Sequence, residues 1–392
     1  MKSYVITITE VDDIDIALEN LNEQMANIEL LKNSVGIVSV SPDFIDSEVY
    51  AAVANALPFP VAGMTTFSQT ANGETGMFLL SILVLTSDTC EFSCGYSAKI
   101  TDDADITGLM RDCYAEVKSG LSGEPKLALL YAPFPSNDLT GPACEALNAL
   151  SAENSDMPVF GSLACREVEN VMESCAIFGA GASTEHFALV LMSGDISPDF
   201  YVGAVADDAT LISVVGVVTK ASGNRVYEIN GVNTKQFLEQ MNYFMGKDVT
   251  EAATSAILIA ETKDENGKIL SSLAQGILLL TDEYAVLDNF IEVGTVLSLA
   301  ALTKEAVIET TTKATEWVKA HEQNKAALIY SCLGRWFAAA DESLKEFDII
   351  DKALAGISYQ ASYSGGEICP TSVKGEKMLN AKHTSSVTVC IF

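Results

Sequence analysis

The sequence predicts a mixed α/β protein of two domains, in which helices pack on mixed sheets and a strand-helix-strand-strand unit recurs. Three observations support this prediction. The chain has 392 residues, which is too long for one ordinary core. Hydrophobic residues make up 48% of the sequence and charged residues 19%, as in a well-packed globular protein. The same order of apolar and helical segments also occurs three times.

Each of the three copies has an apolar run, a helical pattern, a second apolar run that stops at glycine, and a closing apolar run. The segments are 36–40, 44–57, 59–66 and 78–85 in the first copy, 126–132, 143–150, 157–164 and 187–192 in the second, and 326–330, 341–354, 357–363 and 386–392 in the third. Copies one and two share a Pro-Val-x-Gly motif, at Pro60 and Pro158. The third copy matches in pattern alone.

The remaining elements follow from periodicity and capping. Alternation predicts a strand over 4–8, and helical spacing of apolar residues predicts a helix over 11–31. Ser41, Pro42 and Asp43 are typical of a helix start. A helix over 101–118 and a Gly-, Ser- and Pro-rich linker over 119–125 follow.

We place the domain boundary near Gly203, which divides the chain into residues 1–203 and 204–392. The second domain is expected to contain strands over 213–219, 226–229, 254–260, 276–280 and 296–302, and helices over 234–245 and 305–322. Thr234 is the expected cap of the first of these helices.

Charge and composition exclude several classes of function. The formal net charge is -30, so nucleic acid and anionic membrane surfaces would be repelled. No leader segment and no apolar run of bilayer length occurs, which predicts a cytoplasmic protein without membrane insertion. Nine irregularly spaced cysteines indicate reduced thiols rather than a disulfide framework.

Opposite charges at two predicted strand ends define a candidate ligand site. Arg335 follows the run that ends at Tyr330, and Glu367 follows Gly365 and Gly366. A guanidinium can bind a carboxylate and a carboxylate can bind an ammonium, and an amino acid carries both groups. The alternative is a structural salt bridge between the two side chains.

The other candidate site residues lie at equivalent turns. Thr65, Thr66 and Ser162 could add hydroxyl hydrogen bonds to a ligand, or could cap their own turns. Gly365 and Gly366 could let the backbone approach a ligand, or could only form the turn.

Two other classes of function remain open. Cys332 stands at a strand end near a basic residue and could act as a nucleophile, with His383 as its base, in a hydrolase or transferase. A buried, inert thiol is the alternative. The protein could also be an interaction scaffold without a small ligand. No cofactor and no metal is expected, because Gly179 and Gly181 lack the third glycine of a dinucleotide motif and no histidine pair occurs.

The chain resembles the FIST family of sensory modules, and the similarity covers almost its whole length. The segments that carry it include 59–66, 157–162, 218–224, 227–231, 331–335 and 363–368, with His383 and Thr384. The resemblance implies an N-terminal and a C-terminal FIST domain and recognition of a small polar metabolite, with amino acids as the proposed class. Since this sequence contains no output domain, it also implies signalling through a separate partner protein.

Overall fold

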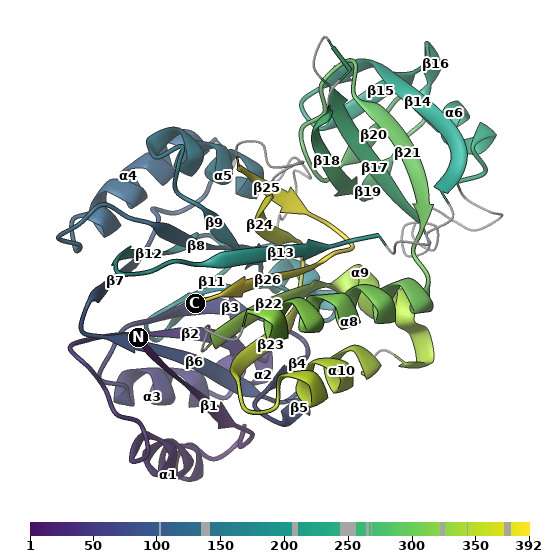
Figure 1. The fold of residues 1–392 in the computed structure, drawn as a ribbon. Helices are drawn as coiled ribbons and strands as arrows, with labels where there is room; N and C mark the ends of the chain where they lie inside the picture. Colours follow the sequence, from purple (N-terminus) through teal and green to yellow (C-terminus); the bar gives the residue numbers. More distant parts are fainter. Residues whose placement is uncertain are drawn as a thin grey trace.

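Three related sheets build the core of the protein, and a fourth sheet projects from it. The computed structural model describes residues 1–101, 103–134, 142–205, 211–243, 256–263, 266–267, 269–321, 326–342, 344–371 and 378–392. Three six-stranded sheets form the core, and residues 211–301, which we call the insert, carry an eight-stranded sheet (Figure 1). The predicted mixed α/β class is confirmed.

The three core sheets follow one plan: an edge strand, an antiparallel closing strand, a parallel pair and a hairpin. The first contains β1 (Lys2–Ile8), β6 (Leu80–Ser87), β2 (Asn33–Val40), β3 (Val61–Thr65), β10 (Ala176–Phe178) and β11 (Gly181–Ser183). The second contains β7 (Cys90–Tyr96), β12 (Ala188–Gly194), β8 (Leu127–Ala132), β9 (Val159–Leu163), β24 (Glu367–Thr371) and β25 (Leu379–His383). The third contains β13 (Asp199–Gly203), β26 (Val387–Ile391), β22 (Ala326–Cys332), β23 (Ser358–Ser364), β4 (Gln69–Ala71) and β5 (Glu74–Gly76). The three predicted copies therefore form three equivalent sheets.

The hairpin that completes each sheet comes from a different copy. The β4–β5 hairpin follows β3 in the chain but pairs with β23 of the third sheet. The β10–β11 hairpin of the second copy pairs with β3, and the β24–β25 hairpin of the third copy pairs with β9. This exchange is cyclic, so it ties all three copies into one body.

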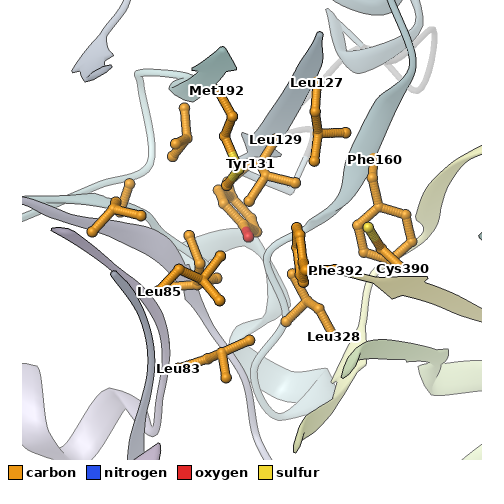
Figure 2. Packing of buried hydrophobic residues seen from close by; sticks show 14 of the residues in the cluster. Leu83, Leu85, Leu127, Leu129, Tyr131, Phe160, Met192, Leu328, Cys390 and Phe392 are labelled. Atoms are coloured by element: carbon orange, nitrogen blue, oxygen red, sulfur yellow. The ribbon is translucent and has the colours of Figure 1, made fainter. Parts of the chain in front are cut away.

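The inner faces of the three sheets share one apolar core, part of which Figure 2 shows. It includes Leu83 and Leu85 of the first sheet, Leu127, Leu129, Tyr131 and Phe160 of the second, and Leu328, Cys390 and Phe392 of the third sheet or just beyond it. Within this core the Tyr330 hydroxyl donates to the Tyr131 hydroxyl at 2.9 Å. Burial of this shared surface is the main force that holds the sheets together.

Helices cover the outer face of each core sheet. They are α1 (Ile14–Met25), α2 (Pro42–Asp46) and α3 (Val49–Ala56) on the first, α4 (Ile106–Lys118) and α5 (Pro142–Glu153) on the second, and α8 (Lys304–Ala320), α9 (Leu333–Ala339) and α10 (Lys345–Leu354) on the third. Short 3-10 segments occur at Val168–Glu173 and Ala340–Glu342. Among the described helices, none combines the length and apolar character that crossing a bilayer would require.

The glycine of the Pro-Val-x-Gly motif is explained by the parallel pairs. Gly63 on β3 lies opposite Val38, and Gly161 on β9 lies opposite Leu130. A Cβ atom would lie 1.9 Å from the Val38 carbonyl oxygen at the first position and 2.0 Å from the Leu130 carbonyl oxygen at the second. Only glycine allows this close approach of two backbones.

The described residues of the insert form an antiparallel sheet and one short helix. Its strand order is β18-β17-β21-β14-β15-β20-β19, with β16 paired to β15. The elements are β14 (Leu211–Ser222), β15 (Arg225–Ile229), β16 (Val232–Asn233), α6 (Thr234–Gln240), β17 (Ala256–Lys263), β18 (Ile269–Gln275), β19 (Ile277–Leu280), β20 (Ala285–Leu287) and β21 (Val296–Ala301). Gly203 ends β13, so the residues after it carry both the insert and the third copy.

Several predicted elements differ from the structure. The expected helix over 44–57 is two helices, because Glu48 between them adopts φ 64°. Arg335, expected at a strand end, lies on a helix, since α9 begins at Leu333. Asn233, not Thr234, caps α6 and accepts from the backbone amides of Lys235 and Gln236. Predicted ends at 244–245, 254–255 and 322 lie outside the described residues, as does residue 343 within the predicted helix over 341–354.

Candidate functional site

The chain segments that follow β3, β9 and β23 meet in the core, and we call residues 65–68, 162–165 and 364–367 the strand-end junction. Two hydrogen bonds join neighbouring segments, Cys165 N to Thr65 O at 2.9 Å and Gly365 N to Leu163 O at 3.0 Å. A third runs from Thr66 Oγ1 to the carbonyl oxygen of Tyr363, directly before the third segment, at 2.8 Å. Each copy therefore contributes one segment. The structure brings together the turns that the sequence singled out.

The predicted hydroxyl groups of the junction are buried and bonded to the backbone. Thr65 Oγ1 accepts from the Cys175 amide at 2.9 Å. Thr66 Oγ1 lies within hydrogen-bond distance of the carbonyls of Ser68 and Tyr363, and Ser162 Oγ donates to the Leu163 carbonyl at 3.0 Å. These contacts fix the turns, as expected for local capping.

The two glycines at this corner make room for protein atoms. A Cβ at Gly365 would lie 2.7 Å from a ring carbon of Phe134 and 2.8 Å from the Ala164 carbonyl oxygen. Gly366 has φ 148°, and a Cβ there would lie 3.1 Å from Cε of Lys382 and 3.5 Å from its Nζ. Because Gly366 has no side chain, the side chain of Lys382 can pack against the backbone next to Glu367.

Arg335 is buried, and its guanidinium pairs with Glu346 and not with Glu367. Its Nη2 donates to Oε1 of Glu346 at 2.8 Å, and neither side chain is exposed. Further bonds reach Thr310 Oγ1 at 2.9 Å and Thr311 Oγ1 at 2.8 Å on α8. The guanidinium therefore ties α9 to α8 and α10, and the structural ion pair that it forms is with Glu346.

Glu367, the last residue of the third junction segment, is a buried carboxyl group. Ser364 Oγ donates to Oε1 at 2.5 Å, and Ser386 Oγ donates to Oε2 at 2.7 Å. Burial raises the pKa of Glu367 to about 7, against the opposing effects of the two hydroxyls and of the charges of Lys382 and Arg335. Within the described part of the chain, no cation lies within ion-pair distance of it.

Lys382 carries a buried positive charge on the strand that pairs with the strand of Glu367. The sequence had not indicated this lysine as a site residue. It lies on β25, where it pairs with Ile368, the neighbour of Glu367. Its Nζ contacts Oδ1 of Asp288, from the insert, at 3.1 Å. Burial lowers the pKa of Lys382, but Asp288, Cys144 and Glu367 together more than offset this, and the pKa lies above its ordinary value. A lysine alternating with small and apolar residues in 379–383 was the signal that could have identified it.

The predicted nucleophile and base are both buried and are not bonded to each other. Cys332 Sγ lies 3.8 Å from Thr384 Oγ1, and burial raises the pKa of the thiol to about 12. The Nε2 atom of His383 lies 3.0 Å from the Cys369 carbonyl oxygen. Burial lowers the pKa of His383 to about 4. This arrangement favours an inert thiol over an activated one.

The described residues do not gather three or more side chains of the types that bind metal ions. All nine cysteines are free thiols. The chemistry of the junction therefore comes from Glu367, Lys382 and the hydroxyl and backbone groups around them.

Comparisons with known proteins identify the family. A model of the FIST N domain matches residues 34–232, and a model of the FIST C domain matches residues 239–370. Domains of this kind are sensory modules that bind small ligands. The chain belongs to the FIST family, as its resemblance predicted. No match was found among curated proteins.

Two solved structures show a distant likeness. One is a cyanuric acid hydrolase with 7% sequence identity and a TM-score of 0.34, over 76% of this chain and 99% of that chain. The other is a cyanuric acid hydrolase from A. caulinodans with 9% identity and a TM-score of 0.34, over 99% of this chain and 98% of that chain. At this level of superposition neither structure informs the chemistry of the junction.

Proposed function

We propose that this chain is a cytoplasmic sensory protein that binds an amino acid, or a related metabolite with one ammonium and one carboxylate group, at Glu367 and Lys382. The carboxylate of the ligand binds Lys382 and its ammonium binds Glu367. The protein then signals through a separate partner protein. In this proposal Lys382 takes the role that the sequence suggested for Arg335, whose guanidinium is committed to Glu346.

The observation that carries the proposal is the buried carboxyl group of Glu367, which has two hydroxyl donors and no ion-pair partner among the described residues. An ionised carboxylate in such a place is costly unless a positive charge accompanies it. Lys382 cannot fully provide that charge, because its ammonium is shared with Asp288. A ligand ammonium would supply it, and burial would strengthen the interaction.

Recognition rather than catalysis is favoured by the state of Cys332. The raised pKa of its thiol and the separate bonding of His383 leave it without an activating base. The nine free thiols support a reducing compartment. The scaffold alternative gains no support from the junction, because a pair of buried, opposite charges is not needed to present an exposed surface.

A thermal-shift screen over amino acids, their amines and their carboxylic acids tests the proposal. A ligand that binds the folded state raises the melting temperature by mass action. The shift should require both charged groups of the ligand and should be lost in Glu367→Gln and in Lys382→Met.

Two matched variants serve as controls for this screen. Glu91→Gln removes an exposed carboxylate that also accepts from serine hydroxyls, those of Ser122 and Ser193. Lys235→Met removes the lysine of an exposed pair with Asp282. Both controls should keep the shift. A panel without any shift, or a shift that survives Glu367→Gln and Lys382→Met, contradicts the proposal.

A further inference from the structure

A turn directly after β20, Asp288 and Asn289, bonds the insert to the core at Lys382. Lys382 Nζ donates to Asp288 Oδ1 at 3.1 Å, and Asn289 Nδ2 donates to the Lys382 carbonyl at 3.0 Å. The turn therefore forms hydrogen bonds with both the side chain and the backbone of Lys382. Figure 1 shows β25 on the side of the core that faces the insert.

The same turn is held rigidly within the insert. The Gly276 amide donates to Asp288 Oδ2 at 2.5 Å, and the Asn289 amide donates to Gln275 Oε1 at 3.1 Å. A Cβ at Gly276 would lie 2.6 Å from Asp288 Oδ2, so a side chain at this position would displace the Asp288 carboxylate. A displacement of Asp288 would therefore also move the end of β18.

Lys382 pairs with one buried carboxyl group, Asp288, and its charge also acts on a second, Glu367. Asp288 holds its ammonium, while Gly366 lets its side chain lie against the backbone next to Glu367. The Lys382 charge affects the carboxyl group of Glu367, and Glu367 in turn affects Lys382. One ammonium cannot fully satisfy Asp288 and a second carboxylate at the same time.

We infer that the Lys382–Asp288 pair is a latch, and that a carboxylate bound at Lys382 displaces Asp288 and releases the turn of the insert from the core. This inference rests on the proposed function for the identity of the ligand, but the latch itself can be tested without it. A second, apolar contact, which includes Ile257, Leu302 and Val307, would keep the insert attached while the turn moves.

Cys144 on α5 reports on the latch. Its thiol lies 3.5 Å from the Asp288 carbonyl oxygen and 3.5 Å from Asn289 Oδ1, and its side chain is buried beneath the turn. Burial raises the pKa of this thiol. Release of the turn would expose Cys144 and make it react faster with a maleimide.

The experiment measures maleimide labelling of Cys144 in the full chain by peptide mass spectrometry. Cys113 on α4 serves as the internal control, because it is buried in the same helical layer and no described contact joins it to the insert. Asp288→Asn should raise the labelling rate of Cys144 by about tenfold, as expected for the loss of roughly 1.4 kcal/mol of closure. Asp282→Asn, which breaks the exposed pair with Lys235, should leave it unchanged.

Two small probes test displacement. Acetate should accelerate labelling of Cys144 in the wild type, because it competes with Asp288 for Lys382. Methylammonium should not, because in this proposal a cation binds at Glu367 and leaves the Lys382–Asp288 pair intact. An amino acid that raises the melting temperature should accelerate it as acetate does. Unchanged labelling of Cys113 and an unchanged circular dichroism spectrum establish that each variant is folded.

The outcomes separate the latch from the proposed function. Unchanged labelling of Cys144 in a folded Asp288→Asn variant overturns the latch. Faster labelling in that variant, with no response to acetate or to any amino acid, overturns displacement by a carboxylate. An amino acid that raises the melting temperature without changing the labelling rate also overturns the latch but leaves the proposed function intact. A response to acetate without any thermal shift in the amino acid panel supports the latch and counts against the amino acid as ligand.

Discussion

Arg335 and Glu346 form a fully buried ion pair, in which Nη2 lies 2.8 Å from Oε1 and both side chains have 0% exposure. Ser331 Oγ and the Tyr363 hydroxyl also donate to the Glu346 carboxylate, at 3.0 Å each. The pair therefore sits within a satisfied polar network that joins α8, α9 and α10 to β22 and β23. The Arg335–Glu346 pair therefore stabilises the packing of helices on the sheet of the third copy.

Arg335→Met should destabilise the protein by about 3–5 kcal/mol, because it leaves the Glu346 carboxylate buried without its cation. The measurement is urea unfolding of the ligand-free protein. Lys345→Met, which breaks an exposed pair with Glu342, is the control and should leave the free energy of unfolding unchanged. If the Arg335→Met variant has wild-type stability but does not bind ligand, the structural role is contradicted and Arg335 is a ligand-binding residue.

Glu367→Gln should change how stability depends on pH. The folded pKa of about 7 lies above the ordinary value of 4.5, so the protonated carboxyl group favours the folded state. This stability is fully present below about pH 4.5 and is lost as the pH rises through about 7. The full shift corresponds to a free energy on the order of 3 kcal/mol. Glutamine stays neutral at every pH, so the variant does not lose this stability as the pH rises.

The measurement is the difference in free energy of unfolding between Glu367→Gln and the wild type, at several pH values without ligand. The difference should move in favour of the variant between pH 5 and pH 8. His383 titrates in both proteins, and its lowered pKa acts in the opposite direction below its ordinary value of 6.5, so it cancels in the difference. A flat difference would mean that Glu367 is already ionised at pH 5.

Cys332 should resist alkylation in the folded protein. Cys332 is buried and the pKa of its thiol is raised to about 12, whereas Cys175 is only partly buried and its pKa is raised to about 11. Iodoacetamide should therefore modify Cys175 first and reach Cys332 only after unfolding in guanidinium. Cys332→Ala should keep any ligand-dependent thermal shift. Rapid alkylation of native Cys332, with loss of binding, would favour the cysteine-dependent enzyme instead.

Gly63→Ala and Gly161→Ala should each destabilise the core severely. A Cβ at either position would lie within 2.0 Å of a carbonyl oxygen on the neighbouring strand, so the parallel pair would have to separate. The loss should reach or exceed the upper part of the roughly 1–3 kcal/mol range for overpacked cores. Gly76→Ala, whose Cβ would have its nearest neighbour at 3.9 Å, is the control. Denaturant unfolding or soluble yield checks this prediction, and equal stability of all three variants would contradict it.

The repeated pattern predicted the fold better than it predicted the site. Each copy carries its parallel pair and closing strand within one short stretch, so local periodicity was enough to identify them. The exchange of hairpins was not predictable in this way. The pairing of β4 with β23 joins residues far apart in sequence, and the motif Pro-Val-x-Gly does not specify which sheet receives the hairpin.

The sequence suggested Arg335 as a ligand-binding residue for a reason that the structure explains. Its position after a strand indicated a ligand group, but α9 turns the side chain toward α8. Glu346 gave a usable signal, because it shares the buried face of α10 with Phe347 and Ile350, where a lone carboxylate needs a partner. Lys382 was missed since its partner Asp288 belongs to the insert, and sequence patterns do not show contacts between such distant segments.

The cyclic hairpin exchange also governs the order in which a growing polypeptide can mature. The first sheet stays incomplete until residues 176–183 have left the ribosome, and the second until residues 367–383 have done so. A chain terminated before Glu367 would keep a bare edge along β9, a site open to aggregation. Truncation near the carboxyl terminus is therefore expected to damage the middle of the protein as much as its end.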